Sequence, residues 1–151
     1  ILCPSPSGRP LRQQWVQETL EGYGGHDFIF ICGRYEGIDQ RFLEHFVDIE
    51  FSIGDFVISA GEIAAIVFAD AMIRQMEGAL GNPKGAQEES FSLKTTQQKT
   101  LLEYPQYTRP ASFRGWEVPA ELLSGDHQGI EQWRAQKAEE KTLRVRPDLL
   151  S

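Results

Sequence analysis

The sequence is poor in the residues that build covalent or metal-bound scaffolds. It contains two cysteines, Cys3 and Cys32, and three histidines among its 151 residues. Both cysteines lie in apolar, strand-like contexts, which favours two buried, reduced thiols over a disulfide framework. The histidines are too scattered to complete a two-cysteine metal site, because such sites need ligands at close, regular spacing.

Long hydrophobic runs are also missing. No apolar run reaches the roughly 20 residues that span a bilayer, and there is no signal-peptide pattern, so we expect a cytoplasmic protein without membrane association. The content of hydrophobic residues is nevertheless 40%, and 11% of all residues are aromatic. This is enough to bury a core in one domain, or in one domain with a small appendage.

An excess of basic charge is absent as well. The formal net charge is −7, which argues against a generic nucleic-acid binder. Most Lys and Arg residues nonetheless fall in the second half of the chain. They form two groups, Lys84, Lys94, Lys99, Arg109 and Arg114, and then Arg134, Lys137, Lys141, Arg144 and Arg146. Each group predicts either a local basic surface or an ordinary solvated face.

Apolar periodicity predicts an α/β domain in the first half of the chain. We expect strands at 1–3, 28–32 and 47–53, a turn at 5–8, and a short extended piece at 56–58. Helices are expected to begin at Pro10 and Asp39, the second with Phe42, Leu43 and Phe46 facing inward, and a third is expected over 62–76. The third helix is apolar nearly all round and should be well buried. Alternating strands and helices are typical of a parallel sheet.

A change in composition divides the chain. The sequence becomes polar at Glu77, which predicts a domain over 1–77, a linker over 78–100 that is mobile unless something binds it, and a second domain over 101–151. Asp126 should cap a helix that runs to about residue 141–143. Because the chain opens on a strand-like Ile1-Leu2-Cys3 without a methionine, we expect that it is the truncated form of a longer protein.

Two glycine-rich breaks follow strand-like runs, at Gly33–Asp39 and at Ser52–Glu62. Glycine lets the backbone turn sharply and lets a ligand touch bare main chain. Two such breaks within thirty residues predict a pocket built from loops at strand ends.

Six stretches carry a resemblance to a known family: Gly33–Asp39, Ser52–Ser59, Leu101–Pro110, Val118–Pro119, Leu122–His127 and Arg146–Leu150. In their residues, order and spacing they resemble the bacterial tRNA (guanine-N1)-methyltransferases of the TrmD type. The resemblance implies an α/β fold with a parallel sheet and a deep trefoil knot of the SPOUT class, followed by a small, mainly helical C-terminal domain.

The resemblance also implies an activity and partners. The activity is methylation of N1 of the guanosine directly 3′ of the tRNA anticodon, with S-adenosylmethionine as methyl donor. The implied assembly is a homodimer in which two subunits share each active site. The C-terminal part, with Tyr104, Tyr107, Arg109 and the basic residues of 134–146, would grip the anticodon stem-loop through phosphates; the tyrosines suit a core equally well.

Three loops would hold the cofactor, largely through backbone groups. Carried over by position, the cofactor-binding residues are Pro6, Gly8, Gly33, Tyr35, Glu36, Gly37, Ile53, Gly54, Asp55, Phe56, Val57, Ile58 and Gly61. Glu36 or Asp55 would supply acidic oxygen beside the sulfonium cation. Glu36 also matches a position that the family links to Mg²⁺, which usually keeps waters and substrate ligands besides a single carboxylate.

Glu89 matches the family's catalytic aspartate, and Arg74 matches a functionally important arginine. A carboxylate can remove the proton from guanine N1 and raise the rate by about 10²–10⁴, although glutamate is one methylene longer than aspartate. The alternatives are an ordinary solvated pair for Glu88 and Glu89, and an ion pair at the dimer interface for Arg74.

The chain departs from the family at Ala60, Ala64 and Glu77, where glycine, proline and proline are usual, and the stretch 93–100 is longer than usual. Two other functions therefore stay open. One is a non-catalytic fragment that binds the cofactor or dimerises. The other is a knotted methyltransferase that acts on the ribose 2′-oxygen, which would need no base for a ring N–H.

Overall fold

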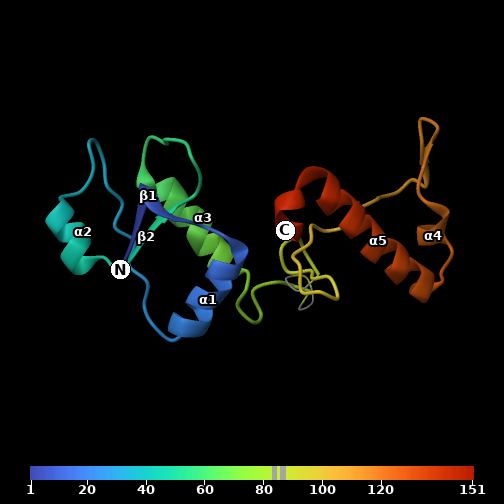
Figure 1. Cartoon of the computed structure of the whole chain (residues 1–151), viewed down its shortest axis with the longest axis horizontal. Helices are drawn as coiled ribbons and strands as arrows, with labels where there is room; N and C mark the ends of the chain where they lie inside the picture. The colour runs from blue at the N-terminus through green and yellow to red at the C-terminus, as the bar shows by residue number, and fades with distance from the viewer. Residues whose placement is uncertain (83–84, 86–87) are drawn as a thin grey trace. The chain divides into compact units, whose positions relative to one another are not determined.

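The computed structural model describes residues 1–82, 85 and 88–151. Its contacts divide the chain into two compact units, residues 1–83 and 84–151 (Figure 1). The first unit mixes strands and helices, and the second is mainly helical. The division falls inside the segment in which the sequence predicts a linker. In the parts of the chain just given, no helix is long and apolar enough to cross a bilayer.

A short parallel sheet organises the first unit. β1 (Leu2–Pro10) pairs in parallel with β2 (Ile49–Ser52), which confirms the expected parallel arrangement. The pairing is interrupted between Pro4 and Arg9, both of which lie opposite Phe51. Residues 5–8, predicted as a turn, thus bulge out of β1 before the chain returns to the sheet.

On its other side β1 meets the run 28–32, which the sequence predicts as a full strand. The structure forms only an isolated parallel bridge there, between Leu2 and Phe30. Two hydrogen bonds hold it, from Leu2 N to Ile29 O at 2.8 Å and from Ile31 N to Leu2 O at 2.9 Å. The pairing ends early because β1 itself leaves the sheet plane after Pro4. The piece at 56–58 is not a strand but a loop with exposed Phe56 and Val57.

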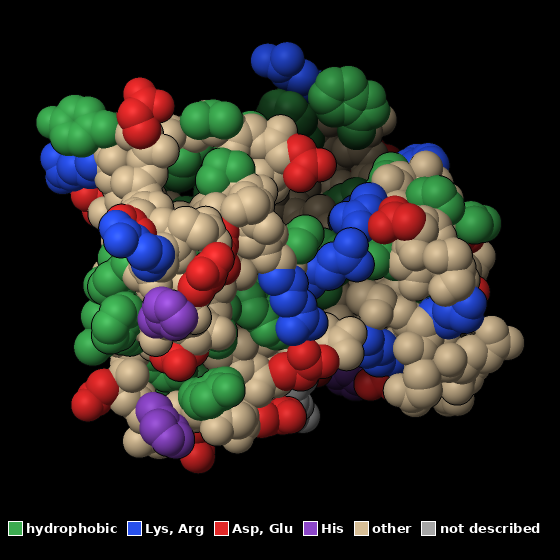
Figure 2. Space-filling view, turned by 60° about the vertical axis from the view of Figure 1, so that its left-hand side comes forward, with side chains coloured by type: hydrophobic (Ala, Val, Ile, Leu, Met, Phe, Trp, Pro, Cys, Tyr) green, Lys and Arg blue, Asp and Glu red, His purple; other side chains and the backbone are tan. Residues whose placement is uncertain are grey.

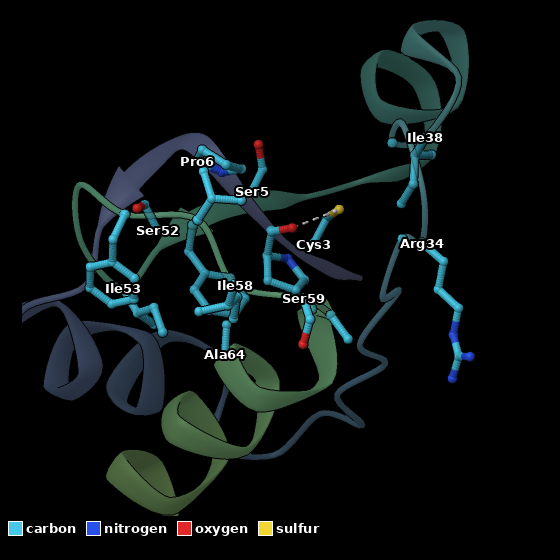
Figure 3. Close-up of a pocket in the computed structure, with 18 of the residues that line it drawn as sticks. Cys3, Ser5, Pro6, Arg34, Ile38, Ser52, Ile53, Ile58, Ser59 and Ala64 are labelled. Carbon is cyan, nitrogen blue, oxygen red and sulfur yellow. Dashed lines mark hydrogen bonds between the residues drawn. The ribbon is translucent and has the colours of Figure 1, made fainter.

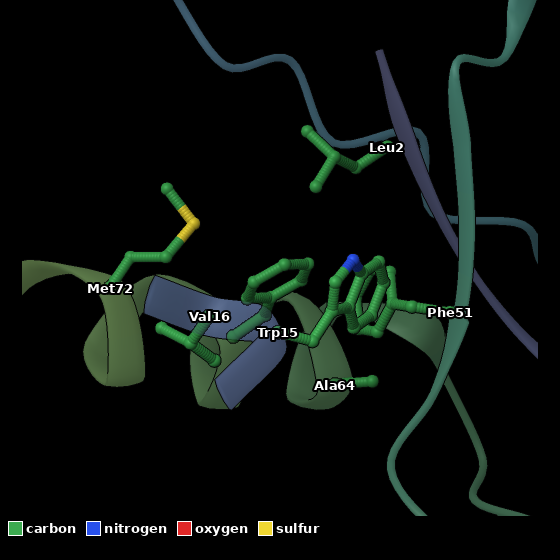
Figure 4. Close-up of a cluster of buried hydrophobic side chains, with 7 residues drawn as sticks. Leu2, Trp15, Val16, Phe51, Ala64 and Met72 are labelled. Carbon is green, nitrogen blue, oxygen red and sulfur yellow. The ribbon is translucent and has the colours of Figure 1, made fainter. Parts of the chain in front are cut away.

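Two helices cover this sheet and form the core with it. They are α1 (Gln13–Tyr23) and α3 (Gly61–Ile73). Phe51 of β2 and Phe68 of α3 are fully buried, with ring centroids 4.7 Å apart. The buried cluster, shown in Figure 4, comprises Leu2, Trp15, Val16, Phe51, Ala64, Phe68 and Met72. Each large side chain removed from water here contributes about 1.5–3 kcal/mol.

Two expectations about helices in this unit were wrong. α1 begins at Gln13 rather than Pro10, because Pro10 is still paired with Ser52 and Leu11 N donates to Ser52 O at 2.7 Å. α2 (Gln40–Phe46) forms where expected, with Asp39 as its cap, but Phe46 is 61% exposed instead of facing inward. Stacking of Phe42 on Phe46, at 5.3 Å, partly shields that ring.

The third helix is also less buried than its composition predicts. α3 buries Ala64, Phe68 and Met72 against the sheet and α1. Its opposite face leaves Ile66 67% and Ile73 57% exposed. A helix that is apolar all round can cover its second face only with another layer, and the first unit supplies one layer.

The second unit is built on α5 (His127–Val145), which begins where Asp126 accepts from Gln128 N at 3.1 Å, confirming the predicted cap. A short helix α4 (Ala120–Leu123), a hairpin of β3 (Ser112–Phe113) and β4 (Trp116–Glu117), and the 3₁₀ turn η1 (Pro147–Leu150) complete it. Thr142 is fully buried and accepts from Leu102 N at 2.8 Å.

Residues 88–100, which the sequence places in the linker, fold back together with Leu101 in the second unit. Phe91 N donates to Leu101 O at 2.8 Å, and Leu101 N donates to Leu93 O at 2.9 Å. Lys94 and Thr100 form an antiparallel bridge next to these bonds. The described part of this segment is therefore hydrogen-bonded structure.

Candidate functional site

One cavity of about 280 Å³ lies in the first unit, where three chain segments meet beside the N-terminus of α3 (Figure 3). The segments are the start of β1, the loop after residue 32, and the loop that joins β2 to α3. The side chains and glycines around it are Cys3, Pro4, Ser5, Pro6, Gly33, Arg34, Tyr35, Glu36, Gly37, Ile38, Leu43, Phe51, Ser52, Ile53, Gly54, Phe56, Val57, Ile58, Ser59, Ala60, Gly61 and Ala64.

This cavity gathers most of the cofactor-binding residues that the sequence predicts. Pro6 comes from the first segment, and Gly33, Tyr35, Glu36 and Gly37 come from the second. The third segment provides the remaining members, Ile53, Gly54, Phe56, Val57, Ile58 and Gly61. Residues spread over almost sixty positions are thus brought to one place.

Two predicted residues, Gly8 and Asp55, do not line the cavity. Gly8 packs on β2, where an added Cβ would lie 2.4 Å from Phe51 N. The missing Cβ of this glycine is needed where β1 returns to the sheet. Asp55 is exposed at the tip of the third loop.

The first segment is held by polar contacts with β2. Ser7 Oγ donates to Glu50 Oε1 at 2.7 Å, and Ser5 and Ser7 hydroxyls lie 2.8 Å apart. Bonds from Ser7 and then from Ser5 hold the pKa of the Glu50 carboxyl below its usual value. The bulge that presents Ser5 and Pro6 to the cavity is therefore fastened by an ionised Glu50.

Backbone conformation shapes the second loop. Tyr35 has φ of 59° and Gly37 has φ of 125°, so the chain turns through the left-handed region twice in three residues. Tyr35 is fully exposed, and Figure 3 shows Arg34 pointing away from the other labelled side chains. Arg34 Nη2 instead reaches Glu62 Oε1 in the first turn of α3, at 3.0 Å.

The third loop is the tightest. Gly54 has φ of 150°, and a Cβ there would lie 2.6 Å from the Phe56 ring. Ser52 Oγ closes the turn by donating to Gly54 O and accepting from Gly54 N, at 3.1 and 3.2 Å. The backbone of this loop thus adopts, at Gly54, a left-handed conformation in which most other residue types would be strained.

The cavity also has walls that the loop motifs do not reveal. Cys3, Leu43 and Ala64 line it from β1, α2 and α3, and Ser59 and Ala60 come from the end of the third loop. Burial, then Glu50 and Cys32, raise the pKa of the Cys3 thiol. In the sequence these residues are recognisable only as apolar or small. Such residues are as common in a hydrophobic core as around a cavity, so the sequence does not identify them as site residues.

Glu36 lies at the cavity, but it does not stand in a metal cluster. Across residues 1–82, 85 and 88–151, the structure contains no group of three or more His, Cys, Asp or Glu side chains that could hold an ion. Among the described residues, the structure thus adds no further ligand group to the single carboxylate, Glu36, that was predicted to hold Mg²⁺.

The two predicted catalytic residues lie outside this cavity. Arg74 follows α3 as its C-terminal cap and is half-buried, with its N–H bonded to Asp70 O at 3.1 Å. Glu89 belongs to the second unit, where its carbonyl accepts from Ser92 N and Leu93 N at 3.1 and 3.2 Å. Glu88 beside it is exposed, whereas Glu89 is half-buried.

Comparison with known proteins identifies the family. The model of the family "tRNA (Guanine-1)-methyltransferase TrmD" matches residues 1–151, the whole chain. The chain belongs to the TrmD family.

Curated relatives agree with the family. The chain is 53% identical over 150 residues to a tRNA (guanine-N(1)-)-methyltransferase of Geobacter sulfurreducens, a match that covers 99% of this chain and 58% of that relative. Proteins of the same name from Methylacidiphilum infernorum and Moorella thermoacetica are 49% and 48% identical, over 99% and 100% of this chain and 60% and 57% of theirs. The chain therefore spans less than two thirds of the length of these TrmD relatives.

Proposed function

We propose that this chain is part of an S-adenosylmethionine-dependent methyltransferase that modifies N1 of the tRNA guanosine directly 3′ of the anticodon. The observation that carries the proposal is the cavity, which brings together from separate stretches of the chain the three loops that would hold the cofactor. The names of the relatives, which specify guanine N1, favour base methylation over methylation of a ribose oxygen.

The cavity fits S-adenosylmethionine in size and chemistry. Its volume of about 280 Å³ is close to the lower end of small-ligand sites, about 300–1,000 Å³. Backbone groups of the second and third loops would pair with the adenine edge, since glycines leave them uncovered. Glu36 is the carboxylate at the cavity that would face the sulfonium, and Ile53 and Ile58 supply apolar walls.

When bound, the cofactor supplies an electrophilic methyl group. The chain's own residues then act on the acceptor. Guanine N1 is a weak nucleophile until its proton leaves, and Glu89 accepts that proton as the general base. Negative charge gathers on O6 as the proton leaves, and the guanidinium of Arg74 offsets it. The C-terminal part binds the anticodon stem-loop, and a protein that modifies tRNA would work in the cytoplasm.

Two features of the family complete the proposal. The chain forms the deep trefoil knot, and two copies assemble so that each active site draws on both. The exposed apolar face of α3, with Ile63, Ile66, Val67 and Ile73, supports dimerisation because a large apolar surface gains by being covered.

Calorimetry with S-adenosylmethionine on this chain, together with methylation of tRNA by the longer protein, tests the proposal. We expect one cofactor bound per chain, and a methyl label that nuclease digestion releases on 1-methylguanosine. Label on a 2′-O-methyl nucleoside, or the absence of both binding and transfer, would rule out the proposed reaction.

A further inference from the structure

A series of hydrogen bonds in the second unit leads from α5 to the segment that carries Glu89. Buried polar groups need partners at defined positions, because a buried donor or acceptor without one is costly. The surface is less informative. On the face drawn in Figure 2, hydrophobic side chains lie among charges of both signs, so surface composition there does not mark a further site.

The series begins at Thr142, whose side chain is fully buried on α5. Its hydroxyl donates to Ala138 O at 2.7 Å, one turn earlier, and accepts from Leu102 N at 2.8 Å. A hydroxyl has one proton and two lone pairs, so the bond to Ala138 leaves an acceptor for Leu102. Lys141 adds a bond from its Nζ to Glu103 O at 2.9 Å. α5 thus holds the main chain of two successive residues.

The same stretch of main chain holds the segment that carries Glu89. Phe91 N donates to Leu101 O at 2.8 Å, and Glu103 N donates to Ser90 Oγ at 2.9 Å, directly beside Glu89. Figure 1 shows this segment, in yellow, beside the C-terminal end of α5. The chain that follows Glu89 is therefore attached to α5 through a single intermediate stretch.

Backbone strain occurs in the same segment. Phe91 has φ of 73°, in the left-handed region that non-glycine residues rarely adopt. Such a conformation persists only where its surroundings impose it, and it is concentrated at functional sites. The bond from Phe91 N to Leu101 O holds it here. The turn that follows Glu89 is thus kept in a conformation that it would not favour by itself.

We propose that Thr142 is a positioning residue for the general base Glu89, and that it acts through residues 101–103 and Ser90. A general base must lie within hydrogen-bond reach of the proton that it removes. Misplacement by about 1 Å can cost about 10²-fold in rate, even when its cause lies far from the chemistry. The proposal rests on the proposed function of Glu89, and it goes beyond that function by assigning how the chain holds the base.

The test compares Thr142→Val with Thr142→Ser. Valine has a similar shape but no hydroxyl, so Leu102 N loses its acceptor, whereas serine keeps one. In the 151-residue chain, amide hydrogen exchange at Leu102 and Phe91 should be at least about tenfold faster in the valine variant.

The longer protein gives the kinetic part of the test. Thr142→Val should slow single-turnover methyl transfer about tenfold, while affinity for S-adenosylmethionine and KM for tRNA change less than about twofold. Thr142→Ser should restore the rate to within about threefold of wild type. A loss confined to the transfer step separates a misplaced base from a general loss of folded protein.

Thr19→Val is the matched control for the valine substitution. Thr19 is also buried on a helix, and its Oγ1 makes the same bond one turn back, to Trp15 O at 2.8 Å. It belongs to the first unit, so its substitution should change the rate of transfer less than about twofold. A wild-type rate for Thr142→Val, an equal slowing by Thr19→Val, or a slowing that serine does not reverse would overturn the proposal.

Ser90→Ala tests the other end of the series without altering α5. It removes the acceptor of Glu103 N and should also slow transfer about tenfold. Ser92→Ala is its control, because the Ser92 hydroxyl has no hydrogen-bond partner in the part of the chain that the structure describes. Equal rates for the two alanine variants would contradict the proposal, even if Thr142→Val fails to fold.

The two proposals fail in different ways. If Glu89→Ala transfers methyl at the wild-type rate, the proposed role of Glu89 is wrong, and the positioning proposal falls with it. If Glu89→Ala is slow while Thr142→Val and Ser90→Ala transfer methyl normally, only the positioning proposal is wrong.

Discussion

At the scale of single residues, the missing Cβ of glycine serves two different purposes. Gly8 lies directly against the backbone of Phe51, in the sheet. Gly54 instead lies at the cavity with a left-handed backbone, beside the ring of the Phe56 side chain. The first position is needed for pairing of the strands and the second for the shape of the pocket.

Gly8→Ala should destabilise the first unit. The added methyl group meets Phe51 main-chain atoms at 2.4–2.5 Å, and backbone cannot rotate away as a side chain can. Overpacking of this kind costs about 1–3 kcal/mol of unfolding free energy, measurable by urea denaturation followed by tryptophan fluorescence, to which Trp15 contributes from the first unit. Gly25→Ala is the control, because nothing lies within 4 Å of its new Cβ. Equal stability of the two variants would contradict the close packing at Gly8.

Gly54→Val should weaken binding of S-adenosylmethionine more than it weakens the fold. A branched side chain is strained at φ of 150° and displaces the Phe56 ring that lines the cavity. Calorimetry of the variant should show at least about a tenfold loss of affinity. Gly25→Val controls for the change of residue type, and an intact affinity at Gly54 would remove the third loop from the cofactor site.

At the scale of secondary-structure elements, contacts decide more than composition does. α3 is apolar on both faces, yet only the face with Phe68 and Met72 is buried. β1 is one strand by position, but its middle is held by side-chain hydrogen bonds from Ser5 and Ser7 to neighbours. We therefore expect the effect of a substitution in either element on stability to depend on its contacts rather than on its residue type alone.

Phe68→Ala and Ile66→Ala should differ sharply, although both lie on α3. Phe68 is fully buried against Phe51, Phe30 and Trp15, so its loss should cost about 3–5 kcal/mol. Ile66 is 67% exposed, and its loss should cost no more than about 0.5 kcal/mol in dilute protein. Denaturation at two protein concentrations checks both values. A cost at Ile66 that grows with concentration would indicate that a second copy covers this face.

Glu50→Gln should change the response of the fold to acid. The pKa of Glu50 is lowered in the folded chain by its bonds with Ser7 and Ser5. Its stabilisation is therefore fully present above the unfolded value of about 4.3 and is lost as pH falls through the lower folded value. Urea midpoints from pH 6 to pH 2.5 should fall less steeply for the variant. Asp55→Asn, at an exposed loop tip, is the control.

At the scale of the whole molecule, the chain distributes its chemistry over two units. The cavity belongs entirely to the first unit, and the proposed base Glu89 belongs to the second. Binding of the cofactor and removal of the proton are therefore separable by substitution, whichever arrangement the units take during the reaction.

Glu89→Ala should slow methyl transfer strongly without removing the binding of S-adenosylmethionine. In the longer protein, methyl transfer should fall by about 10² or more, while affinity for S-adenosylmethionine stays within a few-fold. Glu88→Ala is the matched control, since it removes an adjacent, exposed carboxylate. Single-turnover methylation and calorimetry separate the two quantities. A normal rate for Glu89→Ala, or an equal loss for Glu88→Ala, would exclude Glu89 as the base.

Local patterns in the sequence determined the type of most main elements and the two glycine-rich loops of the pocket. Glycines at 33, 37, 54 and 61 signalled backbone that must turn or be approached closely, and that requirement is local, so it can be read along the chain. The cap at Asp126 and the helix that follows it are local for the same reason.

Only the tertiary structure decided which apolar surface is covered and which glycine meets which neighbour. The early end of pairing at Phe30, the exposed face of α3 and the placement of Gly8 against β2 all depend on contacts between segments far apart in sequence. A side chain is buried only when a second surface packs against it. The pattern of apolar residues along the chain identifies the first surface but not the second. The sequence therefore indicates the backbone conformation and polarity that each residue favours, and the tertiary structure determines which residues it contacts.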